Sequence, residues 1–149
     1  MTSWVEFEEG LTEHLKSLPA GVVVIIDEIE RQKERRRFAQ FRQLDDMIWA
    51  ELPGDDSLDP DVQVRVAGAR LIADAGWQQP DPDHCDNWWY ELRWPATSDA
   101  YRRLASMIVT GLRDAYRVAT PDHLVYDAWN EHAGNRKFEL PRTGLIRES

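Results

Sequence analysis

The sequence has one cysteine and no long run of apolar residues. Cys85 is the one cysteine among 149 residues, so no disulfide can form within the chain, and a reducing compartment is expected. The longest apolar run, Val22–Ile26, is far shorter than the roughly 20 residues that cross a bilayer as a helix. The first residues also lack the basic and apolar regions of a secretory signal peptide. We therefore expect a cytoplasmic protein without a membrane partner.

Positive charge is scarce as well. The chain has 18 Lys and Arg against 27 Asp and Glu, a net charge of −9. General nucleic-acid binding requires a surplus of basic residues that neutralise phosphates, so this class of partner is not expected. The basic stretch Arg31–Arg37 admits a nucleic-acid interpretation, but Glu34 within it favours a solvated hairpin tip in an acidic protein.

Motifs for catalysis, metals and cofactors are missing. The sequence has no GxGxxG or GxxxxGK[ST] phosphate loop. The four histidines are His14, His84, His123 and His132. None of them has the spacing of a short metal site. His84, Cys85 and Asp86 are adjacent, whereas a nucleophile and its base usually come from separate elements. An acidic cluster consists of Asp55, Asp56, Asp59 and Asp61. It lacks the glycine and terminal glutamate of an EF-hand loop, and helix capping explains it. We predict no catalytic residue, no metal and no cofactor.

Alternating apolar and polar residues predict a hairpin in the first third of the chain. Phe38, Gln40 and Arg42 alternate with Ala39, Phe41 and Gln43, and Met47, Trp49 and Glu51 alternate with Ile48, Ala50 and Leu52. This period of two is typical of strands. Strands are expected at 22–30, 36–43 and 46–52, and the lack of helices between them favours antiparallel pairing. We expect Phe41 and Trp49 in the core.

Three helices are predicted around these strands. Ser3 and Glu6 form a capping box at the start of the first helix. Asp59 and Pro60 predict the start of the second, which Gly76 ends. Thr97 or Ser98 caps the third, which extends to about residue 118. These elements predict an α+β fold, a twisted antiparallel sheet with three helices mainly on one face.

A further strand at 87–94 is unusually aromatic. One face carries Trp88, Tyr90, Leu92 and Trp94, and the other carries Trp89, Glu91 and Arg93. The sheet therefore has an apolar group on each side, and the side without helices needs a cover, which could be the tail, a second subunit or a bound peptide. Trp89 is the better candidate for a partner-binding anchor, because its charged neighbours mark the more solvent-facing side.

The C-terminal tail predicts a second hairpin around Gly134, between 124–129 and 137–140, although 122–130 could also form a short helix. In one alternative, Trp129 or Phe138 folds over Trp89 as an intramolecular cap. In the other, this face stays open to a protein partner. Residues 141–149 are expected to fray.

Several short segments resemble the TY-Chap domains, the actinobacterial members of the fold shared by type III secretion chaperones and YbjN proteins. The matching segments are Trp4 with Phe7, Phe38–Phe41, Trp49–Glu51, Leu71 with Ala75–Pro80, and Asn87 before the aromatic strand. The likeness spans about residues 3–118 and recurs weakly in Leu140–Leu145, which leaves 119–149 as a C-terminal extension of a single domain, 1–149. The resemblance implies a non-enzymatic chaperone that binds a protein or peptide client and commonly forms a homodimer.

Two functional hypotheses follow. The first is a protein- or peptide-binding module that holds a client segment on an apolar sheet face or groove. Its contact residues would be Trp88, Trp89, Glu91, Arg93 and Trp129. The second is a small enzyme or nucleotide-binding domain with a site assembled from scattered residues. Those residues would be Asp27, Glu28, Trp89, Glu91 and His84. The absence of any phosphate loop, metal set or nucleophile motif favours the first hypothesis.

Overall fold

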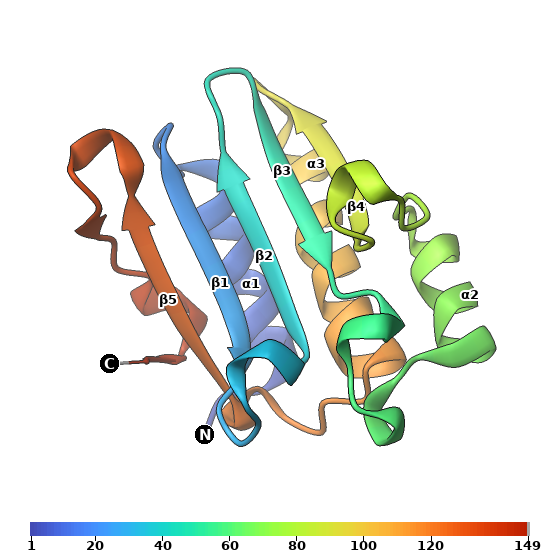
Figure 1. Cartoon of the computed structure of the whole chain (residues 1–149). Helices are drawn as coiled ribbons and strands as arrows, with labels where there is room; N and C mark the ends of the chain where they lie inside the picture. The colour runs from blue at the N-terminus through green and yellow to red at the C-terminus, as the bar shows by residue number, and fades with distance from the viewer. Residues whose placement is uncertain (149) are drawn as a thin grey trace.

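The computed structural model describes residues 1–148 and consists of one mixed sheet and three α-helices (Figure 1). The helices are α1 (Trp4–Lys16), α2 (Arg65–Ala75) and α3 (Ser98–Val109), the last extended by a π-helical segment, Thr110–Ala115. The strands are β1 (Val22–Glu28), β2 (Phe38–Gln43), β3 (Met47–Leu52), β4 (Trp88–Arg93), β5 (Leu124–Asn130), β6 (Arg136–Lys137) and β7 (Ile146–Arg147). Their order in the sheet is β4-β3-β2-β1-β5-β6, and β7 pairs with β5.

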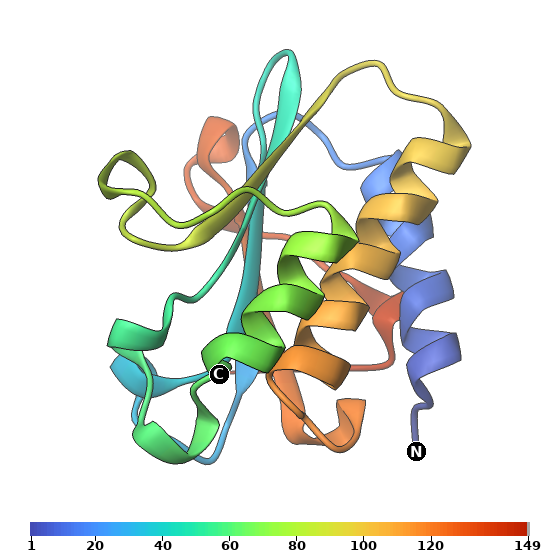
Figure 2. The same ribbon diagram turned by 90° about the vertical axis from the view of Figure 1, so that its right-hand side faces the viewer.

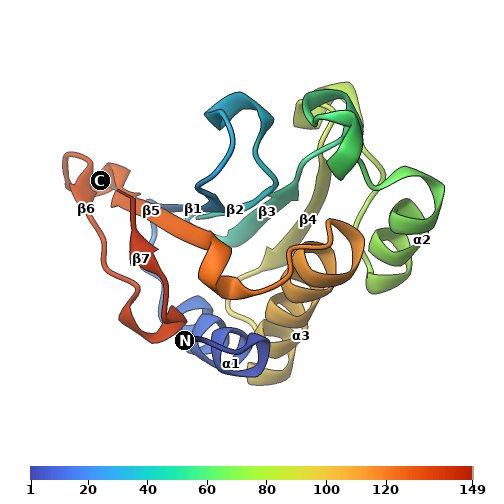
Figure 3. The same ribbon diagram turned by 90° about the horizontal axis from the view of Figure 1, so that it is seen from below.

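The predicted α+β fold is confirmed. All three helices lie on the same side of the sheet (Figure 2), while the β1–β2 and α2–β4 loops rise from the opposite side (Figure 3). Strand β1 pairs antiparallel with β2, as the sequence predicts. Among residues 1–148, the short pair of β5 with β7 is the one that runs parallel.

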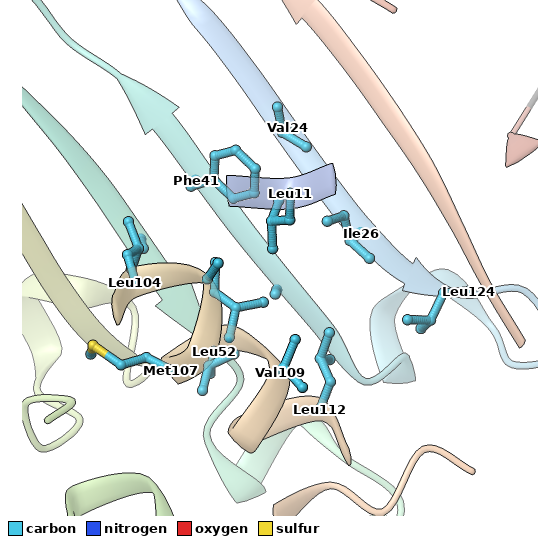
Figure 4. Close-up of a cluster of buried hydrophobic side chains, with 14 of the residues drawn as sticks. Leu11, Val24, Ile26, Phe41, Leu52, Leu104, Met107, Val109, Leu112 and Leu124 are labelled. Atoms are coloured by element: carbon cyan, nitrogen blue, oxygen red, sulfur yellow. The ribbon is translucent and has the colours of Figure 1, made fainter. Parts of the chain in front are cut away.

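The core fills the space between the sheet and the helices. Alternate strand residues point toward the helices, because successive side chains of a strand face opposite sides. Leu11 of α1 and Leu104 of α3 meet Val24 and Phe41 of the sheet there (Figure 4). Phe41 is 1% exposed, so its predicted core position is confirmed.

Helix α1 begins as predicted, whereas α2 does not. The Ser3 hydroxyl accepts a hydrogen bond from the Glu6 N–H, which completes the capping box. The segment Pro60–Val62 forms a 3₁₀ turn, and α2 starts only at Arg65. The carboxylate of Asp55 accepts hydrogen bonds from the backbone N–H groups of Val64 (2.7 Å) and Arg65 (2.9 Å). Asp59, the expected cap, instead accepts a hydrogen bond from Arg31 at 2.9 Å.

The C-terminal tail extends the sheet and does not cover it. Strand β5 pairs with β1 along its whole length, and Gly134, with a positive φ of 65°, lets the chain turn back into β6. The hairpin prediction is therefore confirmed, and the alternative of a helix over 122–130 was wrong. The cap was also wrong: Trp129 stands four strand spacings from Trp89, about 19 Å at the usual separation of strands.

The expected fraying of the last residues is corrected for the part of the tail that the structure describes. Thr143 is 0% exposed, and Glu148 pairs with Arg36 at 2.9 Å. Gly10 of α1 lets this segment approach, because a Cβ there would lie 1.8 Å from the backbone oxygen of Arg142. Ser149 lies outside the described residues.

Candidate functional site

The side of the sheet that faces away from the helices, called the open face below, carries the candidate site. It presents Val23 and Ile25 from β1, Gln40 and Arg42 from β2, Trp49 and Glu51 from β3, Trp89 and Glu91 from β4, and Asp127 and Trp129 from β5. Three of the seven tryptophans, Trp49, Trp89 and Trp129, lie here half-buried. Tryptophan interleaved with charged residues is typical of protein-binding surfaces.

An aromatic cluster forms where the α2–β4 loop folds over the open face. The His84 ring stacks on Trp89 with 4.0 Å between ring centroids and meets Trp49 edge-on at 5.9 Å. Asp81 joins the two ring nitrogens: its carboxylate lies 2.7 Å from His84 Nδ1 and accepts a 3.0 Å hydrogen bond from Trp89 Nε1. The His84 hydrogen bond holds the pKa of Asp81 below its ordinary value. Asp81, through its hydrogen bond, and His84, through stacking, therefore fix the orientation of the Trp89 ring.

The backbone fixes the position of this loop. Gly54 allows the loop to approach, since a Cβ there would lie 2.1 Å from the backbone oxygen of Asp86. The Gly54 N–H donates a 3.3 Å hydrogen bond to the side chain of Asn87. Cys85 and Asp86 have positive φ angles of 57° and 59°, which turn the chain back into β4. His84 is thereby held over the sheet.

A hollow of about 150 Å³ opens beside this cluster. It is lined by Val23, Gln40, Phe41, Arg42, Trp49 and Glu51. Glu51 is 8% exposed and accepts a hydrogen bond from the Gln40 side-chain amide. Burial raises the pKa of Glu51 above its ordinary value, although hydrogen bonding from Gln40 acts in the opposite direction. The hollow is therefore lined by both apolar and polar side chains and holds a carboxylate whose charged form is disfavoured by burial.

The structure places four of the five predicted contact residues on the open face and buries the fifth on the helix side of the sheet. Trp89 and Trp129 are half-buried on the open face, and Glu91 and Arg93 are exposed on the same side. Trp88 is a correction: it is 3% exposed and packs under the helices, so it is not available to a partner.

Sequence reasoning placed Trp49 in the core, and that was wrong. Trp49 lies on the open face, next to Glu51 in the same strand alternation, whereas Ile48 and Ala50 point toward the helices. The charge of Glu51 was the signal that could have identified this face as the open one. The role of His84 as the partner of both indoles carried no sequence signal, because it depends on how the loop folds.

The residues of the enzyme hypothesis are brought together only in part: Trp89, Glu91 and His84 share the β4 edge, whereas Asp27 and Glu28 lie apart from them. Asp27 and Glu28 lie on β1, with β2 and β3 between them and the Trp89–His84 pair of the β4 edge. Burial raises the pKa of Asp27, against the effect of Arg36 at 3.3 Å. Burial would also raise the pKa of Glu28, but its hydrogen bonds with Arg37 outweigh this and lower it. Both carboxylates are occupied by neighbouring arginines.

The expectation of a solvated basic tip is confirmed for residues 32–35, which are exposed, and corrected for Arg31, Arg36 and Arg37, which are half-buried. Every basic residue of the stretch 31–37 lies within 4.0 Å of a carboxylate. Arg31 contacts Asp59 at 2.9 Å and Asp61 at 2.7 Å, and Arg37 donates to Glu28 and to the backbone oxygen of Tyr116. The close ion pairs of Arg31, Arg36 and Arg37 hold the β1–β2 loop against its neighbours, whereas Lys33 and Arg35 remain exposed.

Within residues 1–148, histidine, cysteine and acidic side chains form no group of three or more that could hold a metal ion. In the same range, none of the helices has the length and apolar character needed to cross a lipid bilayer.

Comparison with known families decides the classification. Residues 1–130 match the family described as "T3SS (YopN, CesT) and YbjN peptide-binding chaperone 3", or TY-Chap3. The chain belongs to this family. The match extends past the 3–118 of the sequence resemblance and takes in all of β5. No curated protein and no solved structure matches the chain. Membership in a family of peptide-binding chaperones favours a binding role over catalysis.

Proposed function

We propose that this TY-Chap3 protein is a non-enzymatic chaperone module that holds an extended segment of a protein client across the open face. The observation that carries the proposal is the row of three half-buried tryptophans on the side of the sheet opposite the helices. Family membership supports a peptide as the ligand. In this proposal the protein acts in the cytoplasm. The alternative of a small enzyme is less well supported, because β2 and β3 separate Asp27 and Glu28 from Trp89 and His84.

The size of the open face suits an extended peptide. From β4 to β5 the sheet crosses five strands, a width of about 19 Å, which roughly six extended residues can span. Trp89 and Trp129 lie at the two ends of this path and Trp49 lies between them. Indole rings supply large contact areas with few rotatable bonds, so the entropy lost on binding is small.

Replacing Trp49 or Trp89 with alanine is expected to weaken client binding by at least about 30-fold, or roughly 2 kcal/mol, as for interface anchors in general. The measurement is binding of each purified variant to an array of synthetic peptides of about ten residues with varied apolar and charged composition. Trp94→Ala is the matched control. Trp94 is 53% exposed just beyond β4 and follows the alternation of Trp88, so its removal should leave binding unchanged. Arrays in which Trp49→Ala and Trp89→Ala bind like the parent would contradict the proposal.

We also propose that two copies associate through the outer edge of β4. The backbone of Trp89 exchanges hydrogen bonds with Gln78 (2.8 and 3.4 Å), so Glu91 and Arg93 present their backbone groups in the same outward direction. An exposed strand edge is a template for pairing with another strand. Light scattering is expected to give twice the chain mass of 17.3 kDa. A mass of 17.3 kDa at micromolar concentration would refute this association.

A further inference from the structure

Glu51 is a buried carboxylate between two indole rings. Across the β3–β4 pair, Glu51 stands opposite Trp89, and Trp49 stands opposite Glu91. On the open face, each of the two tryptophans therefore has a carboxylate beside it in its own strand and another opposite it in the paired strand. Electron-rich indole faces together with carboxylates are the combination that attracts an organic cation.

Glu51 accepts a hydrogen bond but forms no ion pair within 4.0 Å among residues 1–148. Gln40 donates to its carboxylate, and the positive charge of Arg42, which also lines the hollow, acts on it at longer range. Arg42, the cation beside the hollow, lies 3.4 Å from Glu131 near β5. A buried carboxylate without a cation in direct contact is costly, and an incoming positive group would offset that cost.

The hollow beside Trp49 has room for such a group. Its volume of about 150 Å³ equals that of roughly five waters. The indole Nε1–H of Trp49 is buried and has no hydrogen-bond partner among the described residues.

The protein already places one ring of its own in these surroundings. His84 stacks on Trp89, meets the edge of Trp49 and lies 2.7 Å from the carboxylate of Asp81. A nitrogen-bearing side chain is therefore accommodated between the same two indoles. His84 does not line the hollow itself, which Val23, Arg42 and Trp49 border.

From this geometry we propose that the hollow bounded by Trp49 and Glu51 is a subsite for a basic side chain, lysine or arginine, of the client. The inference rests on the proposed function and adds to it the chemical class of client: an extended, apolar segment with a basic residue. The net charge of −9 acts in the same direction at longer range. Electrostatic complementarity would then select among segments that the tryptophans alone would not distinguish.

The test uses capped peptides of about eight alternating valine and threonine residues that differ only at one central position. That position is lysine, norleucine or glutamate, and binding is measured by isothermal titration calorimetry. The lysine peptide is expected to bind the parent about tenfold more tightly than the norleucine peptide, and the glutamate peptide more weakly still. Glu51→Gln should bring the lysine and norleucine peptides within about twofold of each other, because it removes the charge and keeps the shape.

Glu9→Gln is the matched control. Glu9 is exposed on α1, on the other side of the sheet, so this variant changes the net charge equally and should keep the preference for lysine. Folding does not obscure the result. The raised pKa of Glu51 means that its charged form destabilises the fold at neutral pH, a cost that is absent below the unfolded-state pKa. We therefore expect Glu51→Gln to be at least as stable as the parent at neutral pH.

The possible outcomes separate the two claims. Equal binding of the lysine and norleucine peptides to the parent would overturn the basic subsite and leave the proposed function intact. A preference for lysine that survives in Glu51→Gln would also overturn the basic subsite, since a group other than Glu51 would then recognise the lysine charge. Failure of all three peptides to bind would count against both the subsite and the proposed open-face function.

Discussion

Deleting residues 120–149 is expected to abolish cooperative folding. The deletion removes β5, which pairs with all seven residues of β1, and leaves the apolar segment Val22–Ile26 as an unprotected strand edge. It also removes core side chains, among them Leu124, Tyr126 and Leu140. Each such side chain contributes about 1.5–3 kcal/mol by burial, so their sum approaches the roughly 5–15 kcal/mol that stabilises a typical domain.

Circular dichroism during thermal and urea denaturation measures this effect. Ile146→Ser serves as the control, because Ile146 is 76% exposed and its replacement alters the tail without removing buried area. A truncated chain that melts cooperatively near the parent temperature would show that 119–149 is a separable extension, as the sequence suggests.

Replacing Phe41 with alanine is expected to lower the free energy of unfolding by about 3–5 kcal/mol, the usual cost of removing a buried phenylalanine. Phe41 is 1% exposed and packs between the sheet and the helices (Figure 4). Urea denaturation of the variant gives the value directly.

Phe38→Ala is the matched control for that experiment. Phe38 belongs to the same strand, but it is half-buried on the open face opposite Asp27. Its removal should cost clearly less than that of Phe41. The reverse ranking would mean that β2 is shifted by one residue, since such a shift exchanges the two faces of a strand.

The sheet and its helical face could be predicted because their signals are local. The alternation around Phe41 and the capping box of Ser3 depend on residues within a few positions, and the structure contains both. The start of α2 was misplaced because Asp59 is used by Arg31, a partner 28 residues away, and no local pattern encodes that contact.

The candidate site was only partly predictable for the same reason. Trp89 was identified from its charged strand neighbours, and the structure does place it on the open face. Trp49 was assigned to the core because a tryptophan is usually buried. It lies two residues from the charged Glu51 in the same strand, however, and this spacing places both side chains on the open face. The prediction that Trp129 packs over Trp89 was wrong because β5 pairs with β1, on the far side of the sheet from β4. The sequence does not reveal this pairing.

The central claim is that the open face binds an extended peptide. The most direct test is a two-dimensional ¹H–¹⁵N spectrum, in which the seven tryptophans give seven indole N–H signals. On titration with the lysine peptide, the signals of Trp49, Trp89 and Trp129 are expected to shift. The other four tryptophans, Trp4, Trp77, Trp88 and Trp94, lie outside the open face and should stay in place. Shifts confined to those four, or no shift of any indole at saturating peptide, would contradict binding at the open face.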